Sequence, residues 1–323
     1  MLNTKPLYSK GIIRDRKMLT QSQFSQVKFS AILNNYVTFY NVAKAINFVD
    51  VATVQLTNDG MKVVVEDAKS VQATAYVMRN CFSEYKLAHV KRKLGPADVT
   101  DDDEPSTSFG LNLKAFTDCL SMFLESEYDS HMKMVHKGDG APLVAILEQG
   151  EDYLITECSV KTMESPEVMD FDFDKDNVCS QVTVNGALFF ALLSELDRNC
   201  DEIEVLLSPD SPSFKLSTFG ELHSESNIEI TDDSEMLISF QSTETTSHRY
   251  KFSHFKLVMG TLALASKVSL RTNKDGLLGM QVMIEISDSS QLFVEYFIVP
   301  LCESNQNNLP ESERSETSEM LDE

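Results

Sequence analysis

The sequence repeats one structural unit four times, and this repetition constrains the fold more than any other feature. Each unit contains a short strand, an amphipathic helix of about ten residues and paired strands. The helices are expected to begin near Val37, Lys114, Ala187 and Phe255. These starts lie about 70 residues apart, and self-similarity at a fixed spacing indicates a repeated architecture. Four such units predict two similar domains with two helices each.

The expected fold class is α+β. In each predicted domain, two helices must lie on one face of sheets that are otherwise antiparallel, because tight turns such as Asn58-Asp59-Gly60 join successive strands. The expected division of the chain is a flexible basic N-terminal extension at 1–24, domain I at 25–160, an interdomain connector at 161–178, domain II at 179–302 and an acidic disordered tail at 303–323.

The formal net charge of −22 is unevenly distributed. Residues 303–323 carry seven acidic residues against Arg314, and Asp98–Glu104 adds five more, whereas the first 22 residues are basic. Without these segments about −15 remains on the folded body, so any DNA-facing surface must be local. This charge distribution excludes a protein that grips DNA by its overall charge.

Residue patterns also disfavour membrane, metal and cofactor proteins. The longest apolar run, Ala187–Leu193, is too short to span a bilayer, and the six cysteines have no spacing typical of a zinc site. His131 and His136 should point to opposite faces of a strand, so they cannot share a metal there. Asp172 begins a segment like a calcium loop that lacks the required glycine and glutamate. We expect a soluble intracellular protein with reduced cysteines and no metal or cofactor.

Six groups of residues, in order and suitably spaced over roughly residues 25 to 300, resemble a known family. They are Gly60–Ala73, Asp118–Ser121, Asp170–Phe173, Ser208–Asp210 with Phe214–Gly220, Lys267–Thr272 and Phe293–Tyr296. In these segments the chain is similar to the Rad-one subunits of the heterotrimeric 9-1-1 DNA-damage checkpoint clamp. The resemblance implies the sliding-clamp fold also found in PCNA, in which four helices per subunit line the hole of a three-subunit ring.

The resemblance further implies a nuclear, non-enzymatic role. A clamp loader would place the ring, completed by subunits of the Rad-nine and Hus-one types, on double-stranded DNA at damage sites. There the ring would be a platform for checkpoint and repair proteins. Two alternatives stay open: a DNA exonuclease whose acidic residues hold Mg²⁺, and a homotrimeric clamp that gives a polymerase processivity. A chain that forms a ring alone favours the processivity clamp, and metal-dependent DNA degradation favours the nuclease.

DNA contact in such a ring is electrostatic, because helices that cross the phosphate backbones offer cations without reading base edges. The candidate DNA-facing residues are Lys44 in the first helix, Lys114 and Lys256 in first-turn positions of the second and fourth, and Arg198 after the third. Acidic residues occupy helix positions where a cation would help. We therefore expect the other two subunits to supply much of the positive field.

A partner pocket beneath the connector is mapped by the same resemblance. It comprises Ser70, Val71, Met169, Phe171, Phe173, Phe297, Val299 and Pro300. Apolar side chains on a polar connector are unusual unless something covers them. The other interpretation is that these side chains pack permanently on their own domain.

The resemblance also maps two edge strands that would pair with neighbouring subunits, at 131–136 and 222–230. The interface residues are His131, Met132, Lys133, Met134, Val135, His136, Leu222, Ile228 and Ile230. A proline at Met134 should then weaken one interface without unfolding the domain. Deleting residues 303–323 should leave assembly and thermal stability nearly unchanged.

Overall fold

The computed structural model describes residues 27–33, 35–88, 107–122, 124, 130–149, 154–173, 177–196, 199–220, 224–287 and 290–302. The first part of the chain forms β1 (Phe29–Leu33), α2 (Tyr36–Ala45), β2 (Val51–Thr57), β3 (Gly60–Asp67), β4 (Val71–Met78), the short 3-10 helix η1 (Arg79–Cys81), β5 (Phe82–Leu87), β6 (Thr107–Asn112), α3 (Leu113–Ser121), β7 (Ser130–His136), β8 (Leu143–Gln149) and β9 (Leu154–Val160). We call these elements domain I.

A connector with one short strand, β10 (Thr162–Met163), leads to the second part of the chain. That part forms β11 (Val178–Asn185), α4 (Gly186–Glu195), β12 (Cys200–Leu207), β13 (Phe214–Gly220), β14 (Glu225–Ile230), β15 (Leu237–Ser242), β16 (Thr246–Lys251), α5 (Phe252–Leu262), β17 (Lys267–Asn273), β18 (Leu278–Ser287) and β19 (Ser290–Ile298). We call these elements domain II. The predicted extension at 1–24 and tail at 303–323 lie outside the described residues, and the predicted domain limits stay a prediction.

Asparagine caps fix the starts of three helices. The side-chain oxygens of Asn35, Asn112 and Asn185 accept hydrogen bonds from the backbone N–H three residues further on, in α2, α3 and α4. Each cap satisfies an N–H that the helix itself leaves unpaired. These three helices begin within one residue of the predicted starts. By contrast, α5 begins at Phe252, three residues earlier than predicted, because Phe252 is buried on the same side as Phe255.

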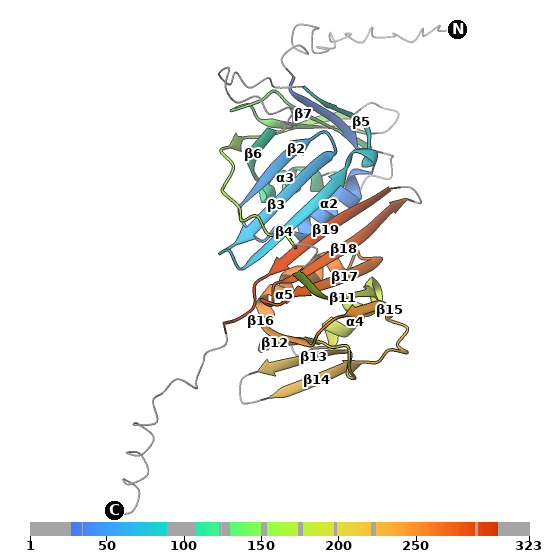
Figure 1. Ribbon diagram of the computed structural model, residues 1–323. Helices are drawn as coiled ribbons and strands as arrows, with labels where there is room; N and C mark the ends of the chain where they lie inside the picture. Colours follow the sequence, from blue (N-terminus) through green and yellow to red (C-terminus); the bar gives the residue numbers. More distant parts are fainter. Residues whose placement is uncertain are drawn as a thin grey trace, which may run out of the picture.

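The strands form three antiparallel sheets, and their order repeats between the domains (Figure 1). The sheet β5-β1-β7-β8-β9 of domain I recurs in domain II as β15-β11-β17-β18-β19, and β6-β2-β3-β4 recurs as the sheet β16-β12-β13-β14. Pairing of β4 with β19 joins the two domains into one ten-stranded sheet, β10-β6-β2-β3-β4-β19-β18-β17-β11-β15. The predicted α+β fold with two similar domains of two helices each is confirmed.

Five strands have no counterpart in the predicted pattern, namely β4, β5, β10, β15 and β16. Four of these, β5, β10, β15 and β16, lie at sheet edges and expose many of their side chains. Their sequences are therefore polar and show little of the alternation that marks a half-buried strand.

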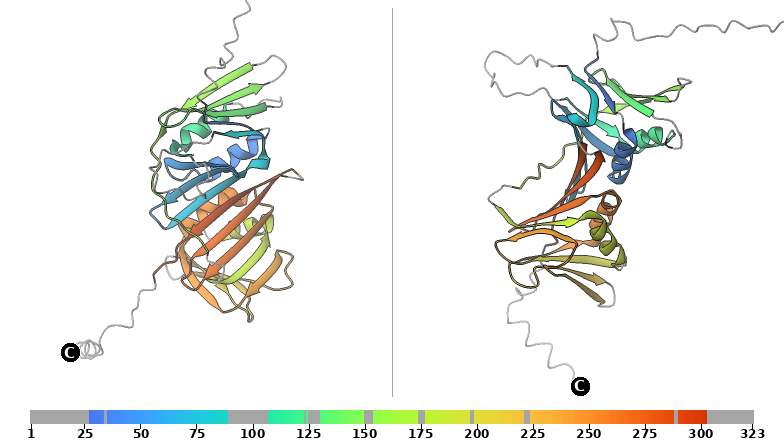
Figure 2. Two further views of the ribbon diagram at one scale, coloured as in Figure 1. Left: turned by 45° about the horizontal axis from the view of Figure 1, so that its top comes forward. Right: turned by 90° about the vertical axis from the view of Figure 1, so that its right-hand side faces the viewer.

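The hydrophobic core lies between the sheets and the helices. The helices lie along one side of the sheets and the connector crosses the other side (Figure 2). On the helix side, Tyr296 of β19 is fully buried and its hydroxyl hydrogen-bonds the hydroxyl of Thr261 of α5. Burial raises the pKa of Tyr296, so the phenol stays neutral in this contact.

Candidate functional site

The four helices form one continuous surface across both domains. Helix α3 packs on α2, α2 on α5, and α5 on α4. At the domain boundary, a Cβ added to Gly260 of α5 would lie 3.4 Å from the Cβ of Ala45 of α2. Little more than a methyl group fits between these two helices. The small residues at this crossing therefore let helices from two domains share one surface.

Three of the four predicted DNA-facing residues lie on this helix surface, and Arg198 lies outside the described residues. Lys44 is exposed in the last turn of α2, and its Nζ lies 5.7 Å from the centre of the Tyr40 ring. Lys256 is exposed, with its Nζ 5.2 Å from the centre of the Phe252 ring. Because α5 begins at Phe252, Lys256 lies in the second turn, and its predicted first-turn position is wrong.

An acidic residue accompanies the third lysine. Lys114 Nζ donates to Asp118 Oδ2 at 2.7 Å, one turn further along α3, and both side chains are largely exposed. The bond raises the pKa of Lys114. The described α-helices contain three lysines, Lys44, Lys114 and Lys256. They also contain two acidic residues, Asp118 and Glu195, whose negative charge offsets part of this positive charge. The local cationic surface is therefore sparse.

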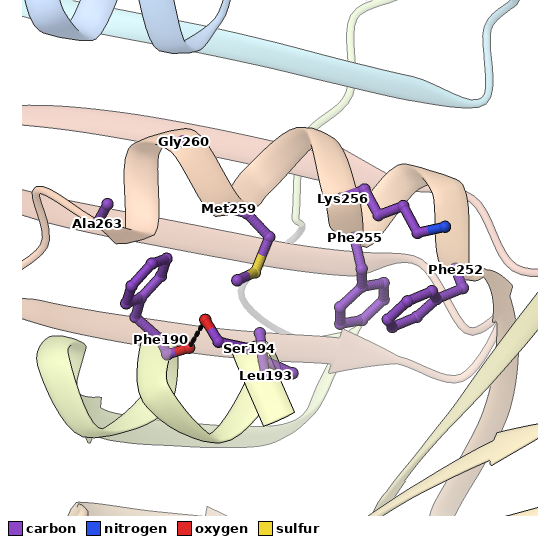
Figure 3. Close-up of a pocket in the computed structure, with 9 residues that line it drawn as sticks. All are labelled: Phe190, Leu193, Ser194, Phe252, Phe255, Lys256, Met259, Gly260 and Ala263. Carbon is purple, nitrogen blue, oxygen red and sulfur yellow. Dashed lines mark hydrogen bonds between the residues drawn. The ribbon is translucent and has the colours of Figure 1, made fainter. Parts of the chain in front are cut away.

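A pocket of about 460 Å³ lies on the same surface between α4 and α5 (Figure 3). Its lining is almost entirely apolar, and the Ser194 hydroxyl donates a hydrogen bond to the Phe190 carbonyl oxygen at 2.7 Å. The lining residues are Phe190, Leu193, Ser194, Phe252, Phe255, Lys256, Met259, Gly260 and Ala263. Lys256 is thus the charged member of this group.

The corresponding positions in domain I are better filled. Counted from the helix caps, Tyr40 corresponds to Phe190 and Leu120 to Met259. Tyr40 and Leu120 are buried, whereas Phe190 and Met259 are half-buried. Leu124 corresponds to Ala263 and packs against the core. The smaller Ala263 therefore helps to leave the pocket between α4 and α5.

The predicted edge at 131–136 is wrong. These residues belong to β7, which lies between β1 and β8 in the interior of its sheet, and Met132 and Met134 are fully buried. The other residues of this prediction, His131, Lys133, Val135 and His136, share that interior strand. The open edge on that side of the sheet is β9, where Ile155 is 55% exposed.

The second predicted edge does lie at a sheet margin. Ile228 and Ile230 belong to β14, the end strand of the sheet β14-β13-β12-β16, and Leu222 lies outside the described residues. Pairing of β14 with another subunit stays a prediction.

The joint between the two domains, which is the pairing of β19 with β4, indicates how the open edges β9 and β14 could pair with other chains. Six antiparallel residue pairs, from Phe293↔Tyr76 to Ile298↔Val71, join β19 to β4. The counterparts of β19 and β4 in the repeated strand order are β9 and β14, which are both open. Matching the hairpin registers places Ile155 of β9 at the position of Phe293 of β19. The chain thus contains one complete pairing, between β19 and β4, and its two counterpart strands, β9 and β14, are not paired with each other.

The connector is fastened to the outer face of the ten-stranded sheet. Pro166 accepts a hydrogen bond from the Thr53 hydroxyl, and Met169 donates its N–H to Glu66 Oε2 at 2.7 Å. Gln72 donates both to the Met169 carbonyl, at 2.7 Å, and to Glu66 Oε2, at 2.9 Å. These bonds hold the middle of the connector over β3 and β4.

The predicted pocket residues come together beyond that point, but the connector itself fills the site. Phe171 stacks on Phe297 with ring centres 5.8 Å apart, and Phe173 packs on the same ring at 5.6 Å. A Cβ on Gly279 would lie 2.4 Å from the Phe173 ring, so glycine leaves the space in which this ring lies. Val71 is fully buried beneath, while Met169 is 42% exposed. Ser70 accepts the Val299 N–H from the strand end that precedes Pro300.

A polar cluster that the sequence prediction did not identify lies beside Phe173. The Arg271 guanidinium lies 5.3 Å from the centre of the Phe173 ring and is hydrogen-bonded to Glu295. Tyr76 donates its hydroxyl to Glu295 Oε2 at 3.3 Å, and burial, with Glu295 next in effect, raises the pKa of Tyr76 to about 12. The cluster links β17, β19 and β4, so it spans the joint between the domains.

The described residues contain neither a cluster of metal ligands nor a membrane-spanning helix. Among them, no three His, Cys, Asp or Glu side chains are grouped so that they could hold a metal ion. None of the described helices combines the length and apolar character needed to cross a bilayer.

Comparison with known proteins gives consistent matches over most of the chain. Residues 28–284 match the family model described as Repair protein Rad1/Rec1/Rad17. A human protein named Cell cycle checkpoint protein RAD1 is 35% identical over 91% of this chain and 97% of its own length. The DNA repair protein Rad1 of Drosophila melanogaster is 29% identical over 87% of this chain and 96% of its own. DNA repair exonuclease REC1 of Mycosarcoma maydis is 26% identical over 50% of this chain and 41% of its own length.

Proposed function

The chain belongs to the Repair protein Rad1/Rec1/Rad17 family, and from this premise we propose that it is a non-catalytic subunit of a ring-shaped clamp that encircles DNA. Family membership and the repeated architecture confirm the sliding-clamp fold. The chain acts in the DNA-damage checkpoint and in DNA repair, in line with relatives that are named checkpoint and repair proteins. Such a role belongs in the nucleus.

The proposal of a ring is supported by two different strands, β9 and β14, that each lie at an open sheet edge. A closed ring of asymmetric chains requires head-to-tail contacts, in which one surface of a subunit meets a different surface of the next. β9 and β14 are two different edges, and the β19–β4 joint supplies a template for their pairing. In this proposal β14 of one subunit pairs with the counterpart of β9 in its neighbour.

The two neighbours are proposed to be different clamp subunits of the Rad-nine and Hus-one types, placed on DNA by a clamp loader. The sparse cations on the helix surface support this arrangement. A duplex in the hole would meet three lysines from this chain, and Asp118 already holds one of them. A homotrimer would repeat that weak surface three times, whereas other subunits can supply the missing positive charge.

Partner proteins are proposed to dock at the outer face, near the connector. Phe297 forms the apolar centre of this site, with Val299 and Pro300 half-buried next to it in the chain, and Phe171 and Phe173 pack on its ring. A checkpoint or repair peptide would therefore have to displace part of the connector or bind alongside it. Met169, 42% exposed at the border of the site, is available for the second mode.

The second candidate function is a DNA exonuclease, because one relative carries that name. That match is shorter and less identical than those to the checkpoint proteins. Incubation of the purified chain with Mg²⁺ and labelled DNA separates the candidates. Degradation that disappears when acidic residues are changed would favour the nuclease.

The decisive experiment reverses the charge of the DNA-facing lysines. Changing Lys44, Lys114 and Lys256 to glutamate, with Arg198 as an optional fourth change, should lower DNA loading. It should also reduce the salt slope by about one for each lost phosphate contact. Ring assembly with the two partner subunits should persist, because these exposed side chains belong to helices and not to the edge strands β9 and β14.

The matched control reverses exposed lysines outside the helices, at Lys86, Lys137 and Lys161. This control has the same net charge and should load normally. A ring loaded on closed circular DNA should slide off once the circle is cut, in every variant. Equal loading by the two triple variants, or retention on linear DNA, would contradict the proposed placement of the helices in the hole.

A further inference from the structure

The α4–α5 surface is poorly suited to DNA. Helix α4 has no lysine or arginine, Leu188 is 44% exposed on it, and the neighbouring pocket is almost entirely apolar. An apolar surface of this kind in a soluble protein usually receives a partner. Among the described residues of α4 and α5, Lys256 is the one lysine or arginine that DNA phosphates would meet. The chemistry therefore points to apolar side chains as the occupant of the pocket.

We propose that residues 303–323 of the same chain fold back over the helix surface and insert Met320 and Leu321 into the α4–α5 pocket. In this segment Met320 and Leu321 are adjacent apolar residues between Glu319 and Asp322. Their side chains match a pocket formed by three phenylalanines, Leu193 and Met259. Thioether sulfur makes favourable contacts with aromatic rings, which suits Met320 beside Phe190 or Phe255.

The position at which the described chain ends supports this occupant. Leu301 donates its N–H to the Arg249 carbonyl of β16 at 2.7 Å. Three residues after Arg249, Phe252 already lines the pocket, a separation of about 10 Å along an extended strand. About 18 residues separate Cys302 from Met320, and such a segment can span up to about 60 Å. The pocket is therefore well within reach.

Charge favours the same occupant. The segment carries seven acidic residues against Arg314, and Glu319 and Asp322 flank the apolar pair. Lys256 belongs to the pocket lining, and Lys251 is exposed at the start of α5. Tethering raises the local concentration of the segment to the millimolar range, so a weak contact is enough for substantial occupancy.

A nucleobase is the other ligand that an aromatic pocket beside a lysine can accept. The lining disfavours it, because Ser194 already donates to Phe190 and few polar groups remain to pair with the edge of a base. Binding of a base is therefore an outcome of the test and not the proposal.

Docking has a consequence that rests on the proposed function. If the helix surface faces DNA, the acidic segment covers Lys256 and presents its own negative charge in the hole. DNA and the segment then compete for one surface, and the segment weakens DNA entry until it is displaced. Only two side chains would be inserted, so deletion of the segment should still change thermal stability little.

The first experiment measures docking directly. A photoreactive benzoyl-phenylalanine replaces Phe190 in the full-length chain, and the cross-linked products are digested with trypsin. Cleavage after Arg314 releases Ser315–Glu323, which contains Met320 and Leu321. We expect cross-links to this peptide at a yield independent of protein concentration. M320S/L321S should remove them, and the matched change L309S should not.

Cross-links that rise with protein concentration would show that a second copy occupies the pocket. Transfer of the cross-link to an added single-stranded oligonucleotide, with no cross-link to the segment in its absence, would assign the pocket to a base. Each of these results, or no cross-link to the segment at all, would overturn the proposal.

The second experiment measures competition in variants of equal charge. M320S/L321S should increase affinity of the full-length chain for duplex DNA about two- to tenfold relative to L309S, as expected for release of a tethered competitor. Cross-linking without this gain would leave docking in place and contradict the DNA-facing role of the helix surface. Thus the two proposals fail separately.

Discussion

Domains I and II have the same order of elements but differ in which surfaces they leave open. In domain II, β19 is closed by pairing with β4, whereas its counterpart β9 in domain I is an open edge. The helix pairs differ in the opposite sense. Tyr40 of α2 and Leu120 of α3 are buried, whereas Phe190 and Met259 at the matching positions of α4 and α5 line a pocket.

The comparison shows that the two domains share the strand order around a buried core and differ at their edges and helix grooves. Cores need matched apolar volume at every repeat, because a lost methylene costs stability wherever it occurs. Edges and helix grooves need only suit whatever covers them. Function is therefore expected where the repeats disagree, and three predictions test whether the disagreements are real.

The largest expected effect contrasts an interior strand with an open one. Met134→Pro places proline between β1 and β8, where it removes ladder hydrogen bonds and a fully buried side chain. We expect a loss of more than about 3 kcal/mol and failure of domain I to fold. Circular dichroism and thermal unfolding of the purified chain measure this. A cooperative, native-like transition would restore the edge assignment of β7.

The matched controls are Thr156→Pro and Glu157→Pro in β9. Successive N–H groups of a strand point to opposite sides, so one of these two prolines leaves every bond to β8 intact. That variant should unfold like the unmodified chain yet fail to assemble with its neighbour in gel filtration. Normal assembly of both variants would show that β9 is not an interface strand.

A smaller effect is expected from equivalent residues in the two helix pairs. Leu120→Ala should cost about 2 to 5 kcal/mol of unfolding free energy, because Leu120 is fully buried under α3. Met259→Ala, at the matching position of α5, should cost about 1 kcal/mol, since Met259 is half-buried at the pocket. Urea denaturation of both variants gives the two values. Equal costs would mean that the two helix pairs are packed alike.

The smallest effect concerns pH. Burial lowers the pKa of His136 in domain I and of His254 in domain II, so folding disfavours the protonated form of each ring. Below about pH 6.5 the unfolded chain binds more protons at these histidines than the folded chain does. The free energy of unfolding therefore decreases as the pH falls. Each histidine can contribute at most about 1.4 kcal/mol per pH unit.

The test compares urea denaturation at pH 7.0 and 5.5. His136→Gln should reduce the loss on acidification more than His254→Gln, because His136 is 1% exposed and His254 is 7% exposed. His136 Nε2 lies 3.1 Å from the Ala141 carbonyl oxygen, and the glutamine amide can keep that contact. An unchanged pH dependence in both variants would show that the two histidines titrate alike in the folded and unfolded chains.

The helices and hairpins were predictable from the sequence because their signals are local. Apolar residues at helical spacing located α2, α3 and α4 within one residue, and turns such as Asn58-Asp59-Gly60 located the hairpins. The place of a strand within its sheet is not local. The sequence of 131–136 does not distinguish an interior strand from an edge strand. The order of the strands in the sheet is needed to show that β1 pairs with the edge of β7 that β8 leaves open.

The sequence predicted that the three phenylalanines of the connector site lie together, but not that the connector rings fill the site. Phe171, Phe173 and Phe297 were expected to lie together, and they do. Whether a connector ring covers its own site depends on space and charge across strands, here Gly279 and Arg271 of two further strands. The aromatic pattern alone is compatible with both an empty and a filled site.

The joint between β4 and β19 determines where a ring built from this chain can open. Mechanical load across that joint is shared by six residue pairs, by the Arg271–Glu295–Tyr76 cluster and by the connector, which is a covalent link in parallel. In the proposed ring, a boundary between subunits has strand pairing but no covalent connection. We therefore expect each chain to move as one stiff arc, and the ring to part only where one polypeptide meets the next.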